Sequence, residues 1–462
     1  MVRGIFTFTR VSPPLNSSSE ITTWGISTSK RVYVKPMKLT QKIRIFPTPE
    51  QEIVLWKLSE KCRLIYNFAL AERKNAYKNG IKGVNYRTQQ NDLPRLKEQF
   101  PEYKWVYSKV LQFTLRLLAA DYESFFALRK NGHPDARPPR FKGKHYFTTI
   151  IYNQSGFKYK HGKVMFSHKY NVVPLKFNIP DKFSFDDKKV KQIAISAQRK
   201  RYFVTITYEL EESPDVDNGL YQAIDLGITN IVTAVNSQGK FLVVNNQRPD
   251  TYWNPKIAEV QARRDRCKKF SNRWKQLNNI KRKYEQKRDN QIKDFQHKLS
   301  KKLVENTRAN TLVVGELEVK KMAQSKTVPQ SMRQGLNSAT QSTGTLGRFV
   351  QFLTYKSKRI GKRLIEFDER NTSRECHVCG KLHPMPIWQR VMSCECGNVI
   401  ARDKNSCVVL MKRYLSQNAK WTGYRAFLDN LRHTAKGKTK VPSPSYGYGS
   451  DDSQEAPSVR VG

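Results

Sequence analysis

The sequence predicts an α+β protein built from several domains. Segments in which apolar and polar residues alternate, typical of half-buried strands, occur on both sides of long stretches whose apolar residues recur every three or four positions, typical of helices. A short acidic linker, residues 211–219, separates two such halves, and four of the seven cysteines lie within 21 residues. A chain of 462 residues is long enough for about two to four domains.

The composition points to a polyanionic partner. The chain has 84 Lys and Arg against 39 Asp and Glu, a formal net charge of +45, and the excess is spread along the sequence. We therefore expect nucleic acid to bind over a large surface, with an affinity that falls steeply with salt. A ribosomal-type protein and a membrane-surface protein fit the charge as well. No apolar run approaches the length of about 18 residues that spanning a membrane requires.

The amino-terminal half begins with a poorly ordered extension, residues 1–37, followed by a strand over residues 40–46. Thr48, Pro49 and Gln51 then form a helix start, with a threonine N-cap, a proline in the first turn and a capping-box glutamine. The helix predicted after this start has apolar residues at helical spacing, namely Leu55, Leu58, Cys62, Ile65 and Ala69.

A second helix is predicted over residues 105–129, and residues 146–210 are rich in strands, including a hairpin that turns at 198–201. Together with the strand at 40–46, these strands are compatible with a small β-barrel. Between them, residues 137–144 combine Arg and Lys with Phe141, which suits either a base-stacking surface or a solvated loop with a buried ring.

In the second half, strands and helices alternate, and we expect them to build one further domain. The predicted strands are 221–234, 240–245, 311–317 and 363–367; the predicted helices are 256–306 (a basic pair), 346–360 and 404–416. Residues 324–345 read as a mobile loop, and the tail from about 434 reads as disordered.

The strongest local motif is a pair of cysteine pairs. Cys376 and Cys379 are followed by Gly380, and Cys394 and Cys396 by Gly397, as a zinc knuckle requires. Four thiolates so placed can present a tetrahedral set to zinc. Substitute ligands, His377 or His383, and a set of reduced cysteines without metal stay open as alternatives.

Acidic residues at element ends predict a second metal site. Asp225 ends an apolar run two residues before Gly227, and Asp403 begins the helix that follows the cysteines. A two-metal nuclease needs several carboxylates that converge on two Mg²⁺ ions. Two residues compete for the place between them, Glu316 and Glu369, each at the end of a predicted strand. Two arginines, Arg374 and Arg402, flank this region and are candidates for contacts with a scissile phosphate.

The order of these motifs resembles that of the TnpB family, transposon-encoded relatives of type V CRISPR effectors. The resemblance rests on Ile-Asp-Leu-Gly at 224–227, Val-Val-Gly-Glu-Leu at 313–317, Thr-Ser-x-x-Cys-x-x-Cys-Gly at 372–380, the second cysteine pair, and Arg-Asp-x-Asn at 402–405. It extends over roughly residues 38–430.

The resemblance implies an RNA-guided DNA endonuclease, with a β-barrel wedge domain that carries a helical recognition insert, followed by an RNase H-like RuvC domain with a zinc-ribbon insert. The boundaries it implies are: extension 1–37; wedge domain 38–48 and 132–212; recognition insert 49–131; RuvC-like domain 213–372 and 398–432, with a helical insert at about 256–306; zinc ribbon 373–397; and tail 433–462.

One position departs from the usual family pattern. The usual motif has Glu where this chain has Gly315, and Glu316 should point to the opposite face because side chains alternate along a strand. Some TnpB proteins and the eukaryotic Fanzor relatives have Gly or Pro there and a Glu just before the Thr-Ser-Cys segment. Glu369 matches that position. The resemblance thus implies Asp225, Glu369 and Asp403 as catalytic Mg²⁺ ligands, with Glu316 as the alternative.

The implied partners are a guide RNA from the transposon end and double-stranded target DNA, bound by a monomer in the cytoplasm of a prokaryote, at the nucleoid. The implied metals are catalytic Mg²⁺ and structural Zn²⁺. Three other functions stay open: a guided DNA-binding repressor without nuclease activity, a miniature type V CRISPR effector, and a zinc-ribbon nucleic-acid-binding protein without a guide.

Overall fold

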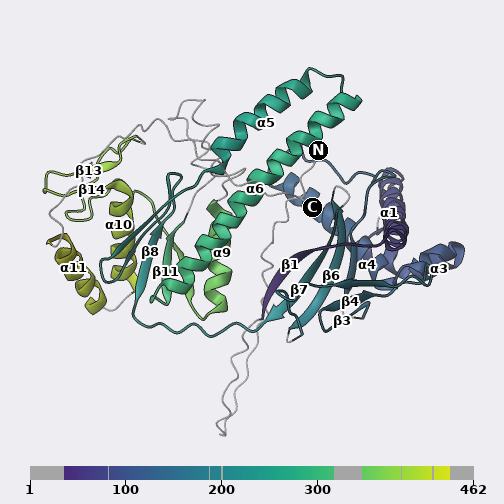
Figure 1. Cartoon of the computed structure of the whole chain (residues 1–462), viewed down its shortest axis with the longest axis horizontal. Coiled ribbons are helices and arrows are strands. Elements are labelled where there is room, and N and C mark those ends of the chain that lie inside the picture. Colours follow the sequence, from purple (N-terminus) through teal and green to yellow (C-terminus); the bar gives the residue numbers. More distant parts are fainter. Residues whose placement is uncertain are drawn as a thin grey trace, which may run out of the picture. The chain divides into compact units, whose positions relative to one another are not determined.

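The computed structural model describes most of the chain (Figure 1): residues 36–81, 83–153, 155–186, 188–198, 201–316, 346–386, 388–418 and 421–436. Three expectations fall wholly or mainly outside these residues: the extension 1–37, the loop 324–345 and the tail from 434. No helix among the described residues is long and apolar enough to cross a membrane.

The first strand and helix follow the sequence prediction closely. Strand β1 spans Met37–Ile45, and helix α1 spans Pro49–Lys78 with the predicted Thr48 N-cap and a complete capping box to Gln51. The helix α4, Ser108–Lys130, corresponds to the second predicted helix. Between them lie elements that the sequence did not predict: α2 (Tyr86–Asn91), α3 (Leu93–Gln99) and the 3₁₀ helix η1 (Pro101–Trp105).

The strands of this half form two antiparallel sheets. A four-stranded sheet has the order β1-β7-β6-β2, and a three-stranded sheet has the order β3-β4-β5. The bounds of the new strands are β2 Ile150–Asn153, β3 Phe157–Lys160, β4 Lys163–Phe166, β5 Leu175–Asn178, β6 Lys189–Gln198 and β7 Arg201–Leu210. The small barrel expected from the sequence therefore corresponds, in the described residues, to two sheets.

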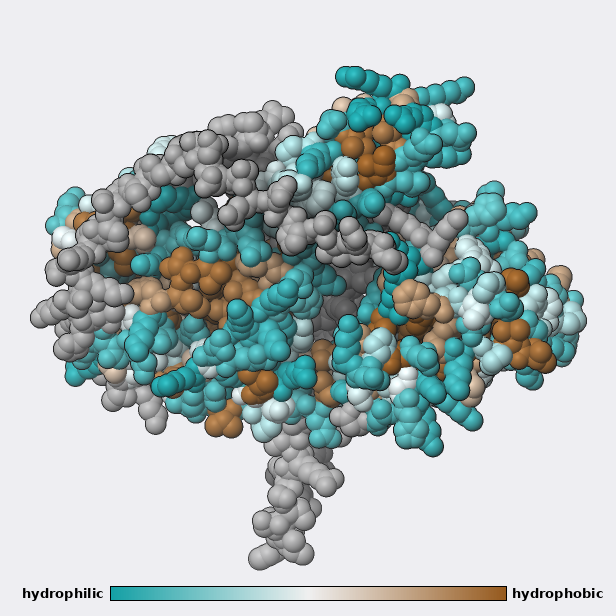
Figure 2. Space-filling model, in the orientation of Figure 1, coloured by the Kyte–Doolittle hydropathy of each residue, from teal (hydrophilic) through white to brown (hydrophobic). Residues whose placement is uncertain are grey.

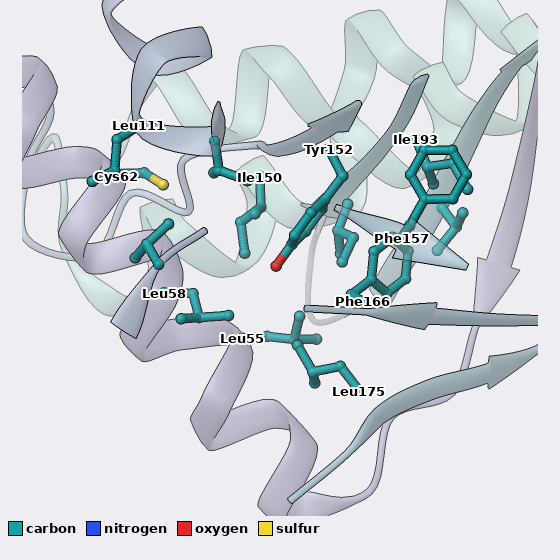
Figure 3. Close-up of a cluster of buried hydrophobic side chains, with 14 of the residues drawn as sticks. Leu55, Leu58, Cys62, Leu111, Ile150, Tyr152, Phe157, Phe166, Leu175 and Ile193 are labelled. Atoms are coloured by element: carbon teal, nitrogen blue, oxygen red, sulfur yellow. The ribbon is translucent and has the colours of Figure 1, made fainter. Parts of the chain in front are cut away.

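One hydrophobic core joins these sheets to α1 and α4. Figure 3 shows Tyr152 of β2 in the middle of this cluster, with Ile150, Phe157 and Phe166 around its ring. Its hydroxyl donates to the Ser167 carbonyl at 3.2 Å, so burial of the ring leaves the polar end satisfied. Removing this much apolar area from water makes the cluster the main source of stability in this half.

The second half is built on a five-stranded sheet of order β10-β9-β8-β11-β12. The bounds are β8 Tyr221–Asp225, β9 Asn230–Asn236, β10 Phe241–Asn245, β11 Thr311–Gly315 and β12 Arg363–Phe367. Strands β8, β11 and β12 are parallel to one another, whereas β9 and β10 run antiparallel to their neighbours. The carboxyl ends of the three parallel strands therefore lie at one edge.

Helices cover both faces of this sheet. One core contains side chains of α6 (Asn272–Asn306) and α9 (Leu346–Arg359), and the other contains side chains of α10 (Arg402–Asn418) and α11 (Trp421–Lys436). Helix α10 begins two residues earlier than predicted, and α11 was not predicted.

Two insertions leave the sheet. Helix α5, Pro249–Asp265, packs along α6 to form a long hairpin (Figure 1). Before α10, two short antiparallel strands, β13 (Val391–Ser393) and β14 (Val399–Ala401), hold the second cysteine pair between them.

Candidate functional site

The predicted carboxylates occupy the edge where the parallel strands end. Asp225 is the last residue of β8 and Gly315 is the last residue of β11. The register pairs Ile224 with Val314, so Asp225 and Gly315 follow next to each other. Gly315 pairs in turn with Phe367, the last residue of β12, and Glu369 comes two residues later. The topology alone therefore brings Asp225 and Glu369 to the same edge.

The Glu369 side chain fills the space above Gly315. A Cβ atom on Gly315 would lie 2.0 Å from Glu369 Oε2, closer than real atoms approach, and 3.0 Å from Glu369 Cβ, a tight contact. The carboxylate of Glu369 thus lies where a side chain at position 315 would lie. The glycine is required for this arrangement because any side chain there would displace the carboxylate.

A tight turn after β12 holds Glu369 in place. Thr372 donates to the Glu369 carbonyl from both its backbone N–H, at 3.1 Å, and its hydroxyl, at 2.9 Å. Asn371 has φ +61°, a left-handed conformation that asparagine adopts more readily than most residues. The Thr-Ser segment of the sequence motif therefore begins with a residue that positions Glu369.

Glu316 lies differently. It follows β11, its backbone N–H donates to the Phe367 carbonyl at 2.8 Å, and its side chain is exposed. Because that bond continues the pairing with β12, the alternation of side chains turns Glu316 away from the face that Gly315 presents. The structure gathers Glu369, and not Glu316, above the end of β11.

Asp403 reaches this edge from the first turn of α10. Asn230, at the start of β9, donates from Nδ2 to Asp403 Oδ2 at 3.0 Å. Arg402 Nε lies 3.7 Å from Asp403 Oδ1. Helix α10 packs against β8 and β9, which fixes the distance between its first turn and Asp225. A carboxylate near a helix amino terminus is also stabilised by the helix dipole.

Asp225 and Asp403 repel each other. The pKa of Asp225 is raised to about 7, first by loss of water around its carboxylate and second by the negative charge of Asp403, with Arg402 acting in the opposite direction. Such a raised pKa marks a group whose charged form lacks compensation in the protein alone. A divalent cation would supply that compensation, and oxygen ligands of this kind are those that Mg²⁺ prefers. The donor set therefore fits Mg²⁺.

The four cysteines of the motif converge. Their sulfur atoms all lie within 4.8 Å of one another, with Cys376 and Cys396 at 3.7 Å and Cys379 and Cys394 at 3.5 Å. A tetrahedral zinc site with Zn–S distances of about 2.3 Å has sulfur–sulfur separations of about 3.8 Å. This geometry fits zinc, and Gly380 and Gly397 have φ of +78° and +84°, as the knuckle turns require.

The two histidines take other roles in the described structure. His383 Nε2 lies 3.2 Å from Cys394 Sγ, next to a ligand sulfur rather than in its place. His377 Nδ1 lies 3.0 Å from Asn405 Oδ1. The four-cysteine group is the candidate metal cluster found among the described residues, without either histidine.

Asn405 links the cysteine cluster to α10, a role that the sequence did not reveal. Its side chain is buried, accepts from the His377 backbone N–H at 3.0 Å and donates to the Glu375 carbonyl at 2.6 Å. One turn of helix thus carries Asp403 for the carboxylate edge and Asn405 for the first knuckle. Asn230 was missed as well, because an asparagine at a strand start carries no sequence signal of a contact so distant along the chain.

The two arginines differ in placement. Arg374 is exposed, and its Nε donates to the His383 carbonyl at 3.2 Å. Arg402 is half-buried beside Asp403, and its backbone N–H donates to the Arg390 carbonyl at 2.8 Å. Arg402 is therefore the one that lies at the carboxylate edge.

The whole arrangement has a counterpart among solved structures. It is similar to the Cas12f1 chain of a cryo-EM structure of the Cas12f1–sgRNA–target DNA complex, with a TM-score of 0.52 and 12% identity, covering 81% of this chain and 98% of that one. This likeness defines the fold class: a mixed α/β multidomain fold of the Cas12f1 kind.

Sequence comparisons show which proteins the chain resembles. Family profiles described as "Probable transposase", "Helix-turn-helix domain" and "Cas12f1-like, TNB domain" match residues 205–326, 37–82 and 347–410. By these matches the chain is similar to proteins of the TnpB family. The region matched by the profile described as "Helix-turn-helix domain", residues 37–82, contains strand β1 followed by one long helix, α1.

Two relatives match over most of the chain. The chain is 26% identical over 406 residues to a Streptomyces pristinaespiralis protein named "Putative RNA-guided DNA endonuclease", covering 86% of this chain and 95% of that protein. It is 25% identical over 362 residues to the Escherichia coli protein named "Putative RNA-guided DNA endonuclease InsQ", covering 73% and 82%.

Proposed function

We propose that this protein is an RNA-guided DNA endonuclease of a transposable element. It would cleave target DNA next to a short flanking motif by two-metal hydrolysis of a phosphodiester bond. Similarity to the TnpB family and the names of two relatives that match over most of the chain support this function.

The observation that carries the proposal is the carboxylate of Glu369 above Gly315. A nuclease that had lost its third acidic residue would present only Asp225 and Asp403 at the edge of the sheet. Here a third carboxylate enters the space that the glycine leaves open, from the turn that follows β12. The set Asp225, Glu369 and Asp403 is the composition that two Mg²⁺ ions require.

Each residue of the set has a distinct task in this proposal. Asp225 presents an oxygen from the end of β8, a strand that is paired with both β9 and β11. Asn230 fixes the rotamer of Asp403 by its hydrogen bond to Oδ2. Thr372 fixes the backbone carbonyl of Glu369, and thereby the direction in which its side chain leaves the turn. Arg402 lies beside Asp403 and would attract a phosphate oxygen that binds next to Asp403.

Mg²⁺, when bound, would lower the pKa of the attacking water and neutralise charge on the phosphate. The water would lose one proton to solvent as its oxygen forms a bond to phosphorus, the bond from phosphorus to the leaving sugar oxygen would break, and that oxygen would take up a proton from solvent. The carboxylates hold the reacting groups in line and remain unchanged in the reaction.

The partners follow from charge. A formal net charge of +45 favours a long polyanion, and we propose a guide RNA from the transposon end together with double-stranded target DNA, bound by one copy of the chain. The cysteine cluster would bind structural zinc and hold the turn that leads into α10, through Asn405.

The test is cleavage of a plasmid that carries a matched target, by the protein purified with its co-expressed RNA. We expect cleavage with Mg²⁺ and none with EDTA. Glu369→Gln should reduce the rate more than about a hundredfold, because even residues that only support a metal ligand are worth about 10–100-fold. Glu316→Gln, one strand end away and exposed, is the matched control and should cleave like the wild type.

The outcome also separates the alternatives. Loss of cleavage in Glu316→Gln but not in Glu369→Gln would refute the assignment of the third ligand. Tight guided binding by the wild type without any cleavage would identify a DNA-binding repressor instead of a nuclease.

A further inference from the structure

The turn that joins α5 to α6 contains a strained aromatic residue. Phe270 has φ +69°, the left-handed conformation that glycine usually occupies and that a bulky residue rarely adopts. It lies just before Ser271, the N-cap of α6, whose hydroxyl accepts from the Trp274 N–H at 3.2 Å. The backbone N–H of Ser271 donates to the Lys268 carbonyl at 3.0 Å, so the turn itself is closed and ordered. Glycine would form the same turn without strain.

The ring of Phe270 faces outward. Its residue is 64% exposed, although the nearby Trp274 offers an apolar surface on which it could be covered. The two ring centroids are 5.4 Å apart at an interplanar angle of 60°, an edge contact that leaves most of the Phe270 residue accessible to solvent. Strain without burial has no evident benefit for folding, and strained residues gather at ligand-binding positions.

Positive charge surrounds this ring. Residues 263–275 contain seven Lys and Arg against one acidic residue, Asp265. Lys269 Nζ lies 5.4 Å from the centroid of the Phe270 ring, and the Arg264 guanidinium lies 5.6 Å from that of Trp274. Asp265 is already paired with Arg264 at 2.6 Å, so it offsets little of the remaining charge. Figure 2 shows apolar surface on this hairpin among hydrophilic atoms.

An exposed ring beside several cations is the pattern that binds single-stranded nucleic acid, because the cations contact phosphates while the ring stacks on a base. Paired bases inside a duplex do not expose a face for stacking. We propose that Phe270 stacks on an unpaired nucleobase, with Lys268, Lys269 and Arg273 contacting the adjoining phosphates. The inference builds on the proposed nucleic-acid partner, but it needs no cleavage activity.

The unpaired base has two possible sources, an unpaired stretch of the guide RNA or a displaced DNA strand. We would measure binding of the full-length chain to fluorescein-labelled 20-nucleotide RNA and DNA single strands. Each strand is made in two matched forms, one with normal bases throughout and one with six abasic sites at its centre, which keep the phosphates and remove the stacking partners. The preference for bases is the ratio of the affinities for these two forms. If it is larger for RNA, the source is the guide RNA; if it is larger for DNA, the source is the displaced strand.

The key variant is Phe270→Gly, because glycine suits the left-handed turn and should leave the melting temperature unchanged or higher. We expect it to weaken binding to the base-containing strand about five- to tenfold and to leave binding to the abasic strand nearly unchanged. Phe270→Trp should keep the preference for bases. Ile280→Ala, which removes a 40% exposed apolar residue on the same hairpin, is the control and should bind both strands like the wild type.

An unchanged preference for bases in Phe270→Gly would overturn the proposal. So would a fall in its melting temperature without any change in that preference, since the ring would then serve only to stabilise the turn. If the protein does not cleave the plasmid, the binding measurements still test the stacking contact. If it cleaves the plasmid but Phe270→Gly keeps the wild-type preference for bases, the stacking contact is refuted and the nuclease function is not.

Discussion

Two carboxylates that would repel each other lie at the edge where β8 meets α10. Burial and the charge of Asp403 raise the pKa of Asp225 to about 7, far above its ordinary value of 3.8. Asp225 therefore binds its proton more tightly in the folded than in the unfolded chain. Its contribution to stability is fully present below about pH 4 and is lost as the pH rises through about 7.

Asp225→Asn should therefore stabilise the metal-free protein, and more so at high pH. In EDTA at pH 8 the melting temperature of the variant should exceed that of the wild type by about 2–4 °C, as expected for a gain of about 1 kcal/mol in a domain of this size. Near pH 4 the two should melt together, because Asp225 is then protonated. Thermal unfolding followed by intrinsic fluorescence across this pH range measures the difference.

Addition of Mg²⁺ supplies the control. A metal that binds the folded wild type raises its melting temperature, so the advantage of Asp225→Asn at pH 8 should shrink or reverse. A difference that is independent of both pH and Mg²⁺ would show that Asp225 is not the strained carboxylate described here.

The sequence led to the candidate residues at this scale but left the choice between two of them open. The alternation of side chains indicated that Glu316 faces away from the position of Gly315, and in the structure the Glu316 backbone continues the pairing with β12 on which that prediction depends. That Glu369 fills the space above Gly315 depends on the parallel pairing of β11 with β12, which no local pattern specifies. Asn230 was missed for the same reason, since its hydrogen bond to Asp403 joins residues far apart in the chain.

At the scale of elements, α10 connects the two candidate metal sites. Its first turn holds Asp403 at the sheet edge, and Asn405, in the second position after it, bonds to the first knuckle of the cysteine cluster. The Ser406 hydroxyl adds a 2.8 Å hydrogen bond to the Thr372 hydroxyl. The turn that carries Glu369 is thus tied to the helix that carries Asp403.

Asn405→Ala should weaken this connection. It leaves the partly buried N–H of His377 and carbonyl of Glu375 without this partner, and a fully buried polar group left unsatisfied costs about 1–3 kcal/mol, so the cost here lies at or below that range. We expect a melting temperature lower by several degrees in the presence of zinc. The control is Asn418→Ala at the other end of α10, an exposed side chain with one 3.3 Å bond to the Tyr414 carbonyl. Equal effects of the two substitutions would contradict the role given to Asn405.

Elements with strong local signals were predicted well, and those that depend on tertiary packing were not. The capping box at Thr48 and the apolar spacing of α1 are local, and both are confirmed. Helices α2 and α3 are short and lack a clear apolar period, and α11 lies almost wholly between the predicted helix 404–416 and the predicted tail from about 434, where no element was predicted. The division of seven strands into two sheets depends on pairing over long distances, which strand patterns leave undetermined.

At the scale of the whole molecule, three segments far apart in the sequence supply one candidate site. Strand β8, the turn after β12 and the first turn of α10 converge because parallel pairing aligns the strand ends and α10 packs across them. The cysteine cluster lies in the chain between Glu369 and Asp403. We therefore expect a change in that cluster to alter the distance between these two carboxylates. The resemblance to the TnpB family, in contrast, was evident from motif order alone, because that order does not require the spatial arrangement.

The central claim is that Glu369 takes the place that a glutamate at position 315 would otherwise fill. It is tested most directly by moving the carboxylate back, in the variant Gly315→Glu with Glu369→Ala. We expect guided plasmid cleavage to be lost in each single variant, by crowding above β11 in the first and by loss of the ligand in the second. The double variant should regain cleavage at a rate at least about tenfold above that of either single variant. If the double variant is no more active than Glu369→Ala alone, while its melting temperature and RNA binding match the wild type, the two positions do not share one place and the account is wrong.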